Sequence, residues 1–513
     1  MVVLVNEDEI TRRWSSFFGR KAIAEKIKQL CVDSCKKRRL SLDYPEIFSS
    51  DSDLAESILL DPKNTISIGE GLLAKTIRSP KHPQICITGL PQQTIVTIDR
   101  IAERKDGRFL SVKGIVVKGP VHFGTMYDSD DKQSSDCGDA EIIGDLCDND
   151  QRLTVRLRDI DTDIFGRVLI FNGFFGNSGV FEVNSVELPD NFYGTSFSEE
   201  EKEKILHCSR DPDFFNDLVS SIAPDVHDME DVKSILALQL FGGVSRNNDG
   251  FMLGNIHLLL LAEPGTEVSS LLRSMSRLSP KGIFLPDNRQ HADIRLNGKG
   301  IFDHDGGTSA IEVGAVTIAN EGLVCCDNLA RYKDEEGALH IIVHDAIDTF
   351  RCGPSMIRLP SNTSLLCSMI PDTNMITDGL KNREQTDLHP HILGQFDMVI
   401  PIRNTPKKAV PVNDIQPSTV YDEEFIRKYV AYARLNCRPA FCEQITDLAM
   451  KEYQSLRKSH DCTNGRLAEL MIALAEASAR SRLSDTVEEI DVLRGSALVG
   501  NCLNRLDSLY HRS

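Results

Sequence analysis

A strand, a glycine-containing turn and a helix start follow one another within Ile256–Arg273, and this order constrains the fold more than any other stretch. The apolar run Ile256–Leu261 is long enough for one strand buried on both faces. The turn 262–266 comes next, and an amphipathic helix begins near Ser269. Because backbone N–H groups and a helix N-terminus cradle phosphates in such a layout, the stretch predicts a phosphate-binding loop.

The loop lacks the positive charge that its layout requires. The position before Ser269, where a phosphate-binding loop has Lys, is Val268. Two carboxylates, Glu263 and Glu267, stand where a triphosphate would lie. The sequence therefore predicts a nucleotide site that has lost its chemistry.

The residues after this loop predict a parallel α/β sheet. Short apolar runs alternate with helical segments, as parallel sheets require; the runs are Leu323–Cys326, Ser364–Ile370 and Asp397–Ile402. Asp327 follows the first of these runs. Because ligands bind at the carboxyl ends of parallel strands, we expect the loop and Asp327 at one edge of the sheet.

The N-terminal half predicts helices followed by a small β-barrel. Apolar residues between positions 7 and 60 fall at helical spacing, and the basic patch Lys36–Arg39 is interpreted as a solvated helix end. Strand patterns then run from residue 85 to 186, consistent with an OB-like barrel of about five strands. Among them Arg152, Arg156 and Arg158 alternate with apolar residues, which places three guanidinium groups near one face or rim.

An acidic stretch, residues 128–150, interrupts the β region and predicts a mobile, solvated loop. Its two thiols, Cys137 and Cys147, cannot supply the four ligands of a zinc site. The formal net charge of −18 argues against a uniformly basic nucleic-acid surface but leaves room for a local basic channel. In the C-terminal part, Thr486 with Glu489 is interpreted as the capping signal of a last helix.

The order of these pieces resembles the minichromosome maintenance (MCM) family of AAA+ replicative helicases over nearly the whole chain. The phrases that carry the resemblance are SIAPDVHDMEDVKSILALQLFGGV (221–244), IEVGAVTIANEGLVCCDN (311–328), HPHILGQFDMVIPI (389–402), FIRKYVAYAR and LAEASARSRLS. The layout looks closer to archaeal members than to eukaryotic ones.

The resemblance implies a multidomain α+β and α/β fold. Its parts are an N-terminal helical domain (1–83), an OB-like β domain without the family's zinc module (84–190), a linker with helices (191–228), an AAA+ P-loop ATPase-type domain (229–410) and a C-terminal helical lid (411–513).

The resemblance also assigns family roles to single positions. The retained nucleotide-site residues are Gly265, Thr266 and Ser269 in the phosphate loop, Asp327 in Walker B and Arg466 as the second-sensor arginine of the lid. The altered positions are Val268 for Lys, Asn328 for the water-polarising Glu, Ile370 for the sensor Asn and Gln395 for the arginine finger. Because losing an arginine finger alone costs about 10³–10⁵ in rate, the resemblance implies a vestigial site without catalytic residues. ATP and Mg²⁺ binding is expected to be weak or lost, and no cofactor or metal is expected.

Two hairpins that face DNA in relatives are also implied by the resemblance. The first, Asn297–Ala310, makes Lys299 a hairpin lysine rather than a phosphate ligand. The second, near Phe350–Arg358, has Cys352 at its usual Lys position, with basic residues on either side. The expected DNA contacts are therefore Arg152, Arg156, Arg158, Lys299, Arg351 and Arg358.

Three functions remain open at this point. The first hypothesis is a DNA-binding pseudo-ATPase, associated with replication, repair or recombination. It would bind single-stranded or duplex DNA with low specificity and associate with MCM-type subunits, possibly in a hexameric ring. The alternatives are an ATP-dependent DNA helicase subunit active only in a mixed ring, and a protein-interaction scaffold without DNA binding.

The expected location is intracellular. Fourteen scattered Cys indicate reduced thiols, and no apolar run approaches the ~18 residues of a membrane span. We expect the cytoplasm or nucleoid if the source is archaeal, and the nucleus if it is eukaryotic.

Overall fold

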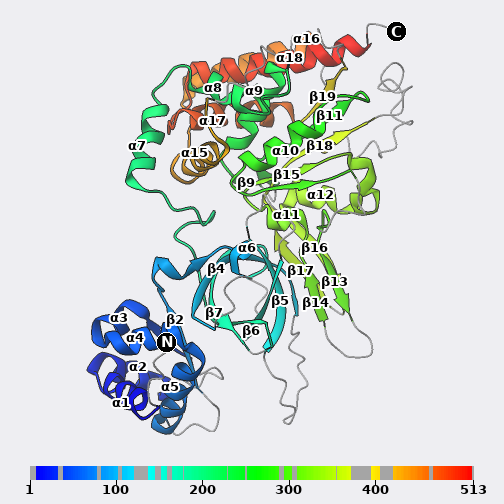
Figure 1. The fold of residues 1–513 in the computed structure, drawn as a ribbon. Coiled ribbons are helices and arrows are strands. Elements are labelled where there is room, and N and C mark those ends of the chain that lie inside the picture. Colours follow the sequence, from blue (N-terminus) through cyan, green and yellow to red (C-terminus); the bar gives the residue numbers. More distant parts are fainter. Residues whose placement is uncertain are drawn as a thin grey trace, which may run out of the picture. The chain divides into compact units, whose positions relative to one another are not determined.

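The computed structural model describes residues 7–32, 39–77, 83–101, 107–120, 137–144, 152–158, 164–176, 178–227, 229–248, 251–287, 294–302, 309–353, 355–370, 394–404, 420–460 and 466–510. These residues form two compact units (Figure 1). The first comprises Met1–Gly194 with Phe302–Ile311, and the second comprises Thr195–Ile301 with Glu312–Ser513.

The first unit begins with five helices that share one apolar core. They are α1 (Glu7–Phe18), α2 (Lys21–Val32), α3 (Tyr44–Ser50), α4 (Ser52–Leu60) and α5 (Pro62–Ile77). Trp14 is fully buried between α1 and α5, and its indole N–H donates to the Thr65 carbonyl at 2.9 Å. The apolar residues at helical spacing form this core, in which Phe17 and Ile23 are buried as well.

The prediction of helix throughout residues 7–60 is wrong at one place. Strand β1 (Arg39–Asp43) lies between α2 and α3 and pairs in parallel with β2 (Gln84–Thr88). Leu40 and Leu42 point into the core while their neighbours are exposed, which is the alternation of a strand. Arg39 therefore starts a strand rather than ending a helix, and residues 36–38 of the basic patch lie outside the described residues.

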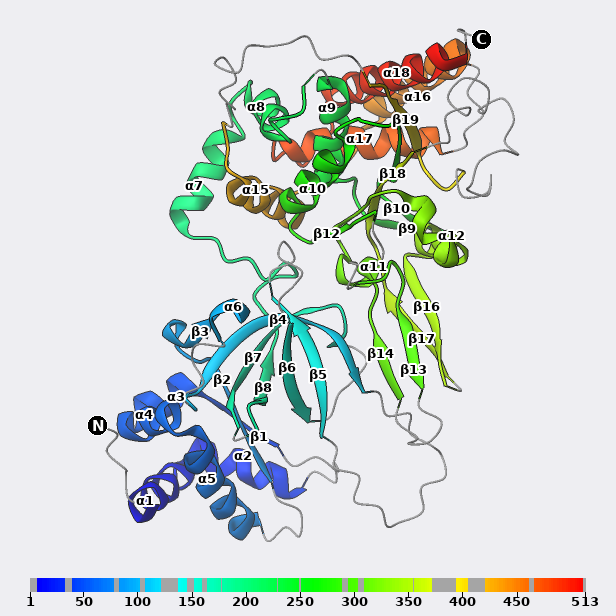
Figure 2. The ribbon, with the colours of Figure 1, turned by 45° about the vertical axis from the view of Figure 1, so that its right-hand side comes forward.

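The predicted OB-like barrel is confirmed (Figure 2). Its strands are β4 (Leu110–Pro120), β5 (Cys137–Ile143), β6 (Arg152–Arg158), β7 (Val168–Phe175) and β8 (Phe181–Glu187), preceded by β3 (Ile95–Val96) and α6 (Ile98–Ile101). The pairs β4–β5, β5–β6, β6–β8, β8–β7 and β7–β4 return to the starting strand and close the barrel. Closure of this kind leaves no free sheet edge.

Strand β5 lies inside the acidic stretch that the sequence predicts to be a loop, so that prediction is wrong for Cys137–Ile143. Ala140, Ile142 and Ile143 are buried in the barrel. The carboxylates of Asp139 and Glu141 pair with basic side chains across the strand pair, so these acidic residues are compatible with a strand at the barrel surface. The rest of the stretch, 128–136 and 145–150, lies outside the described residues.

The second unit is organised around a five-stranded parallel sheet in the order β12–β15–β18–β11–β19. The strands are β11 (Leu258–Ala262), β12 (Gly282–Leu285), β15 (Leu323–Cys326), β18 (Ser364–Met369) and β19 (Met398–Ile402). Helices α9 (Glu230–Phe241) and α10 (Val268–Leu278) pack on it, and all five residues of β11 are buried. This arrangement confirms the predicted α/β fold of the AAA+ P-loop type.

Shorter elements precede or connect these five strands along the chain. They are β9 (Arg246–Asn248), β10 (Phe251–Leu253), β13 (Lys299–Phe302), β14 (Ser309–Glu312), α11 (Ala315–Ile318), α12 (Glu336–Asp345), β16 (Ile347–Cys352) and β17 (Ser355–Pro360). Strands β16 and β17 form the second predicted hairpin. Of the first predicted hairpin, residues 303–308 lie outside the described residues.

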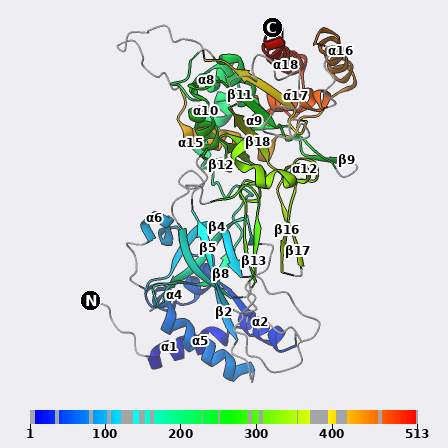
Figure 3. The ribbon, with the colours of Figure 1, turned by 90° about the vertical axis from the view of Figure 1, so that its right-hand side faces the viewer.

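Helices complete the second unit, and they include the predicted lid (Figure 3). They are α7 (Glu199–Cys208), α8 (Phe214–Ser221), α15 (Glu423–Asn436), α16 (Glu443–His460), α17 (Leu467–Ser481) and α18 (Glu489–Tyr510). Among the residues that the structure describes, no helix combines the length and hydropathy that a membrane span requires.

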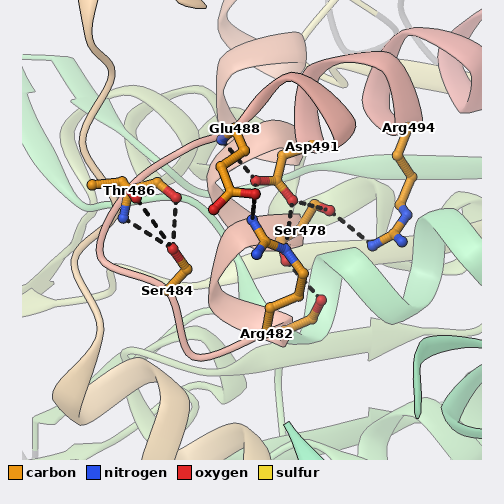
Figure 4. Close-up of polar contacts among 8 residues, drawn as sticks. Ser478, Arg482, Ser484, Thr486, Glu488, Asp491 and Arg494 are labelled. Atoms are coloured by element: carbon orange, nitrogen blue, oxygen red, sulfur yellow. Dashed lines mark hydrogen bonds and ion pairs between the residues drawn. The ribbon is translucent and has the colours of Figure 1, made fainter. Parts of the chain in front are cut away.

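The start of α18 differs from the predicted capping signal (Figure 4). Thr486 contacts Ser484 instead of the helix. The cap is Asp491, whose carboxylate accepts the Glu488 N–H at 2.9 Å and an Arg482 N–H at 2.6 Å. It also accepts the Ser478 hydroxyl of α17 at 2.8 Å, so one buried carboxylate joins α17 to α18.

We expect the Asp491→Asn substitution to destabilise this part of the lid by about 2–3 kcal/mol. Asp491 is fully buried and pairs with Arg482 at 2.6 Å, so its loss leaves that guanidinium with the more distant and exposed Glu488 carboxylate at 3.5 Å. Hydrogen exchange of the α18 amides measures the local opening free energy. The control is Glu489→Gln, an exposed carboxylate on the same helical turn. An equal effect of the two substitutions would contradict this role for Asp491.

Candidate functional site

The phosphate-binding loop lies at the carboxyl edge of the sheet, between β11 and α10. Gly265 has φ +85°, a left-handed conformation that favours glycine. A β-carbon there would lie 2.9 Å from Nδ2 of Asn404, the second residue after β19. Asn404 also donates its backbone N–H to the Glu263 carboxylate at 2.8 Å and its side-chain amide to the Pro264 carbonyl at 3.1 Å. Hydrogen bonds from Asn404 therefore hold the loop in its conformation.

The side chains of the loop supply no positive charge. Val268 is the first residue of α10 and is 3% exposed, packed in the main core. Ser269 is exposed beside it, and the Thr266 hydroxyl donates to the Glu263 carbonyl at 2.8 Å. The position that resembles the phosphate-binding Lys thus contributes to packing instead of to the charge of the loop.

Asp327 lies at the same carboxyl edge, directly after β15. Its carboxylate accepts the Ser368 hydroxyl at 2.7 Å, and Ser368 belongs to the neighbouring strand β18. Asn328 has φ +57° and donates its side-chain amide to Asp287 at 2.9 Å. Ile370, at the position of the sensor Asn, follows β18 and is 47% exposed. Position 328 therefore carries an amide that is hydrogen-bonded to Asp287, rather than the Glu carboxylate that the family resemblance leads us to expect there.

Arg466 lies at the amino edge of the sheet, opposite the phosphate loop. Within a single chain, the two are therefore not brought together. It forms an ion pair with Asp397 at 2.7 Å and donates to the Gln395 carbonyl at 2.9 Å. Asp397 directly precedes β19, and its carboxylate accepts the N–H of His257, which directly precedes β11. Because β11 and β19 are parallel, these residues mark the amino end of the strands, whereas the loop follows their carboxyl end.

The surroundings of Arg466 are mostly buried and contain several titratable groups. Burial raises the pKa of Asp397 to about 6, and the adjacent Arg466 acts in the opposite direction. Burial lowers the pKa of His257 well below its ordinary value, and burial together with His340 and Arg466 lowers the pKa of His344. At neutral pH, Asp397 is therefore ionised and holds Arg466 in place.

The second hairpin has one buried and one exposed face. Strands β16 and β17 pair with Arg351 opposite Met356 and Thr349 opposite Arg358. The two arginines share the exposed face, and neither forms an ion pair with the described residues. The buried face includes Asp348, which accepts the Gly298 N–H at 2.7 Å. This bond ties the hairpin to the residues before β13. The hairpin therefore holds Arg351 and Arg358 on a fixed scaffold.

The other predicted DNA contacts carry compensated charges. Arg152 pairs with Glu141 at 2.9 Å, Arg156 with Asp139 at 2.8 Å, and Lys299 with Glu312 at 2.9 Å. Arg158 is the last residue of β6, and its side chain lies outside the described residues. Phosphate contact at the barrel face would have to displace carboxylates, so the β16–β17 hairpin is the better candidate DNA interface.

The sequence reasoning missed the residues that hold these groups in place: Ser368, Asp397 and Asn404. Ser368 is one of two serines in a strand that is otherwise apolar, so the sequence offered only a weak signal for it. Nothing in the sequence pairs Asp397 with Arg466 or Asn404 with Gly265, because 69 and 139 positions separate them. Among the described residues, no group of three or more His, Cys, Asp or Glu side chains is arranged to hold a metal ion.

Comparison with known proteins identifies the family. A model of the MCM P-loop domain matches residues 201–413, and a model of the MCM AAA-lid domain matches residues 424–503. The chain belongs to the MCM family. The fold agrees with a full-length MCM homolog from Methanopyrus kandleri, with a TM-score of 0.72 at 21% identity, covering 98% of this chain and 99% of that chain.

Curated MCM relatives include DNA replication licensing factors. The chain is 28% identical over 337 residues to DNA replication licensing factor mcm4 of Schizosaccharomyces pombe, covering 59% of this chain and 36% of the relative. It is 25% identical over 345 residues to minichromosome maintenance protein MCM of Saccharolobus solfataricus, covering 62% and 50%. The match thus spans half or less of the length of these relatives.

Proposed function

We propose that this MCM-family protein is a DNA-binding subunit with little or no ATP hydrolysis of its own, acting in replication, repair or recombination. The observation that carries the proposal is the burial of Val268 at the first residue of α10. Phosphoryl transfer depends on charge neutralisation around the phosphates. An apolar core residue at that position supplies no positive charge, and the loop adds the carboxylates of Glu263 and Glu267.

The retained groups support a structural role for the loop. Gly265 has the conformation that the turn needs, and Asp327 bonds to Ser368 between adjacent strands. Both residues therefore contribute to the fold without nucleotide. This accounts for their presence in a site that has lost its Lys, water-polarising Glu, sensor Asn and arginine finger.

The exposed face of the β16–β17 hairpin supports DNA binding. Arg351 and Arg358 are the predicted contacts that are both exposed and without an ion pair among the described residues. Phosphate contacts of this kind give affinity that falls with salt and reads little sequence. We therefore propose that the chain binds DNA with low sequence specificity. We also propose that it assembles with other MCM-type subunits in a ring.

We expect the double substitution Arg351→Glu with Arg358→Glu to weaken binding to single-stranded DNA by at least about tenfold. Each lost phosphate contact also lowers the slope of log affinity against log salt by about 1. Fluorescence anisotropy with a labelled oligonucleotide at several salt concentrations measures both quantities. Lys451→Glu with Arg457→Glu on α16 changes the net charge equally and is the matched control. Loss of affinity in both double variants would argue for a general charge effect.

Two alternatives would give different results. A scaffold without DNA binding is favoured by the carboxylate pairing of Arg152, Arg156 and Lys299, and it predicts no salt-dependent DNA binding by the unmodified chain. A helicase subunit active in a mixed ring predicts ATP turnover after addition of an active relative, with dependence on Asp327. Here Gln395 offers no cation to a neighbouring site, so this chain would contribute no arginine finger from that position.

A further inference from the structure

A cavity of about 540 Å³ lies in the second unit between α16 and α17. Four α16 residues line it: Thr446, Ala449, Met450 and Tyr453. Their spacing is i, i+3, i+4 and i+7, so they form one stripe along two turns of the helix. The cavity is therefore an elongated groove beside α16, which we call the lid groove.

The opposite wall of the lid groove has the same periodicity. Ala468, Met471 and Ile472 of α17 line it at positions i, i+3 and i+4. Two helices that direct such stripes into one groove provide the surface on which a third helix packs. The small residues Ala449 and Ala468 leave room for side chains from that third helix.

Helix α16 is incompletely packed for its length and pattern. None of its 18 residues is buried, whereas most residues of α17 are. Its Ile445 and Leu448 rest on the small core cluster beneath the lid, but Met450 is 53% exposed. Ile472 across the lid groove is 38% exposed. Ala449 and Tyr453 of the second stripe pack against core residues, whereas Met450 remains exposed. Since helices gain most of their stability by burying an apolar face, the Met450 end of this stripe lacks a cover.

The charges at the rim of the lid groove specify what that cover must contain. Arg246 and Arg438 line the groove, and among the described residues that line it none is Asp or Glu. Arg246 pairs with buried Glu476 behind it, while the Arg438 guanidinium forms no ion pair within the described part of the chain. An occupant with carboxylates beside its apolar side chains would complement this rim.

We propose that the lid groove binds an acidic amphipathic α-helix of a partner protein. Its apolar side chains, spaced i, i+3 or i+4 and i+7, fill the space between Met450 and Ile472. Its Asp or Glu side chains face Arg438 and Arg246. A second copy of this chain is a poorer occupant, because two chains of formal net charge −18 repel each other at long range.

The test uses the full chain and a synthetic probe. The probe is a fluorescein-labelled, end-capped peptide about 18 residues long, with Leu at the i, i+3, i+4 and i+7 positions and Glu on the flanks. Fluorescence anisotropy is compared with a scrambled peptide of the same composition and with a Lys-flanked version. We expect the Glu-flanked peptide to bind at least about tenfold more tightly than either comparison peptide.

Substitutions distinguish the lid groove from other surfaces. Met450→Glu and Ile472→Glu should each weaken binding of the Glu-flanked peptide by about tenfold or more. Ile490→Glu is the matched control, because Ile490 is 52% exposed on α18 and does not line the lid groove. Arg438→Glu should weaken binding of the Glu-flanked peptide and strengthen binding of the Lys-flanked one. Circular dichroism melts verify that every variant remains folded.

Three results would overturn the proposal. The first is equal affinity for the Glu-flanked and scrambled peptides. The second is an equal loss of affinity in the Ile490→Glu and Met450→Glu variants. The third is a dimer of the unmodified chain in analytical ultracentrifugation that dissociates on Met450→Glu, since a second copy would then be the occupant. None of these outcomes depends on DNA or ATP binding, so failure here is separate from failure of the proposed function.

Discussion

Purified chain is expected to hydrolyse ATP no faster than its own Asp327→Ala variant. Loss of an arginine finger alone costs about 10³–10⁵ in rate, and here the Lys, the water-polarising Glu and the sensor Asn are absent as well. Val268 occupies the core instead of neutralising phosphate, and Asn328 is bonded to Asp287. A coupled-enzyme assay with Mg-ATP, run on both proteins prepared in parallel, measures the difference.

A second variant strengthens this comparison. Val268→Lys restores the cation in sequence, but the side chain begins in a packed core and must extend out of it. We expect this variant to remain inactive and to be less stable, because the other three chemical groups are still missing. Steady ATP turnover by the unmodified chain that disappears in Asp327→Ala would refute the pseudo-ATPase proposal.

The second large effect concerns the pH dependence of stability through Lys281. This side chain is fully buried before β12, and burial lowers its pKa to about 7, with Glu321 acting in the opposite direction. The unfolded chain, in which the group titrates near 10.5, therefore binds more protons between about pH 7 and pH 10.5. The free energy of unfolding should rise with pH across that window, by up to about 1.4 kcal/mol per pH unit.

The Lys281→Met substitution should remove most of this pH dependence. We expect the variant to be more stable than the parent near pH 7, and this advantage should shrink by about 2–3 kcal/mol between pH 7 and pH 9. Urea denaturation followed by circular dichroism at the two pH values measures both differences. Lys451→Met, at an exposed lysine of α16, is the control. A parent chain whose stability did not change between the two pH values would contradict the role assigned to Lys281.

The fold was largely predictable because its main signals are local. A buried strand followed by Gly265 and a helix start can be recognised within about twenty residues, and period-2 and period-3.6 patterns mark the other elements. The errors arose where local composition misled. Strand β1 follows a basic patch, and β5 lies in an acidic stretch, so both looked solvated. Their stability comes from pairing with other strands, which composition does not reveal.

The altered positions of the candidate site can be identified in the sequence. The arrangement of its side chains is much harder to predict. The absence of Lys at Val268 and of the finger at Gln395 can be counted in the sequence. Which basic residues are the better candidate DNA contacts cannot be predicted from the sequence, because it depends on which carboxylates lie beside them. Arg156 and Arg351 look equivalent in sequence, yet only Arg156 meets a carboxylate across a strand pair.

The sequence by itself determined the MCM-type fold, and it predicts a nucleotide site without its chemistry, since both depend on residue identity at fixed spacing. The tertiary structure alone decided where charges are compensated and surfaces left uncovered. It placed Arg466 beside Asp397, at the sheet edge opposite the phosphate loop, and it left the lid groove open. The physical reason is that electrostatic pairing and burial act between neighbours in space, and these neighbours are far apart along the chain.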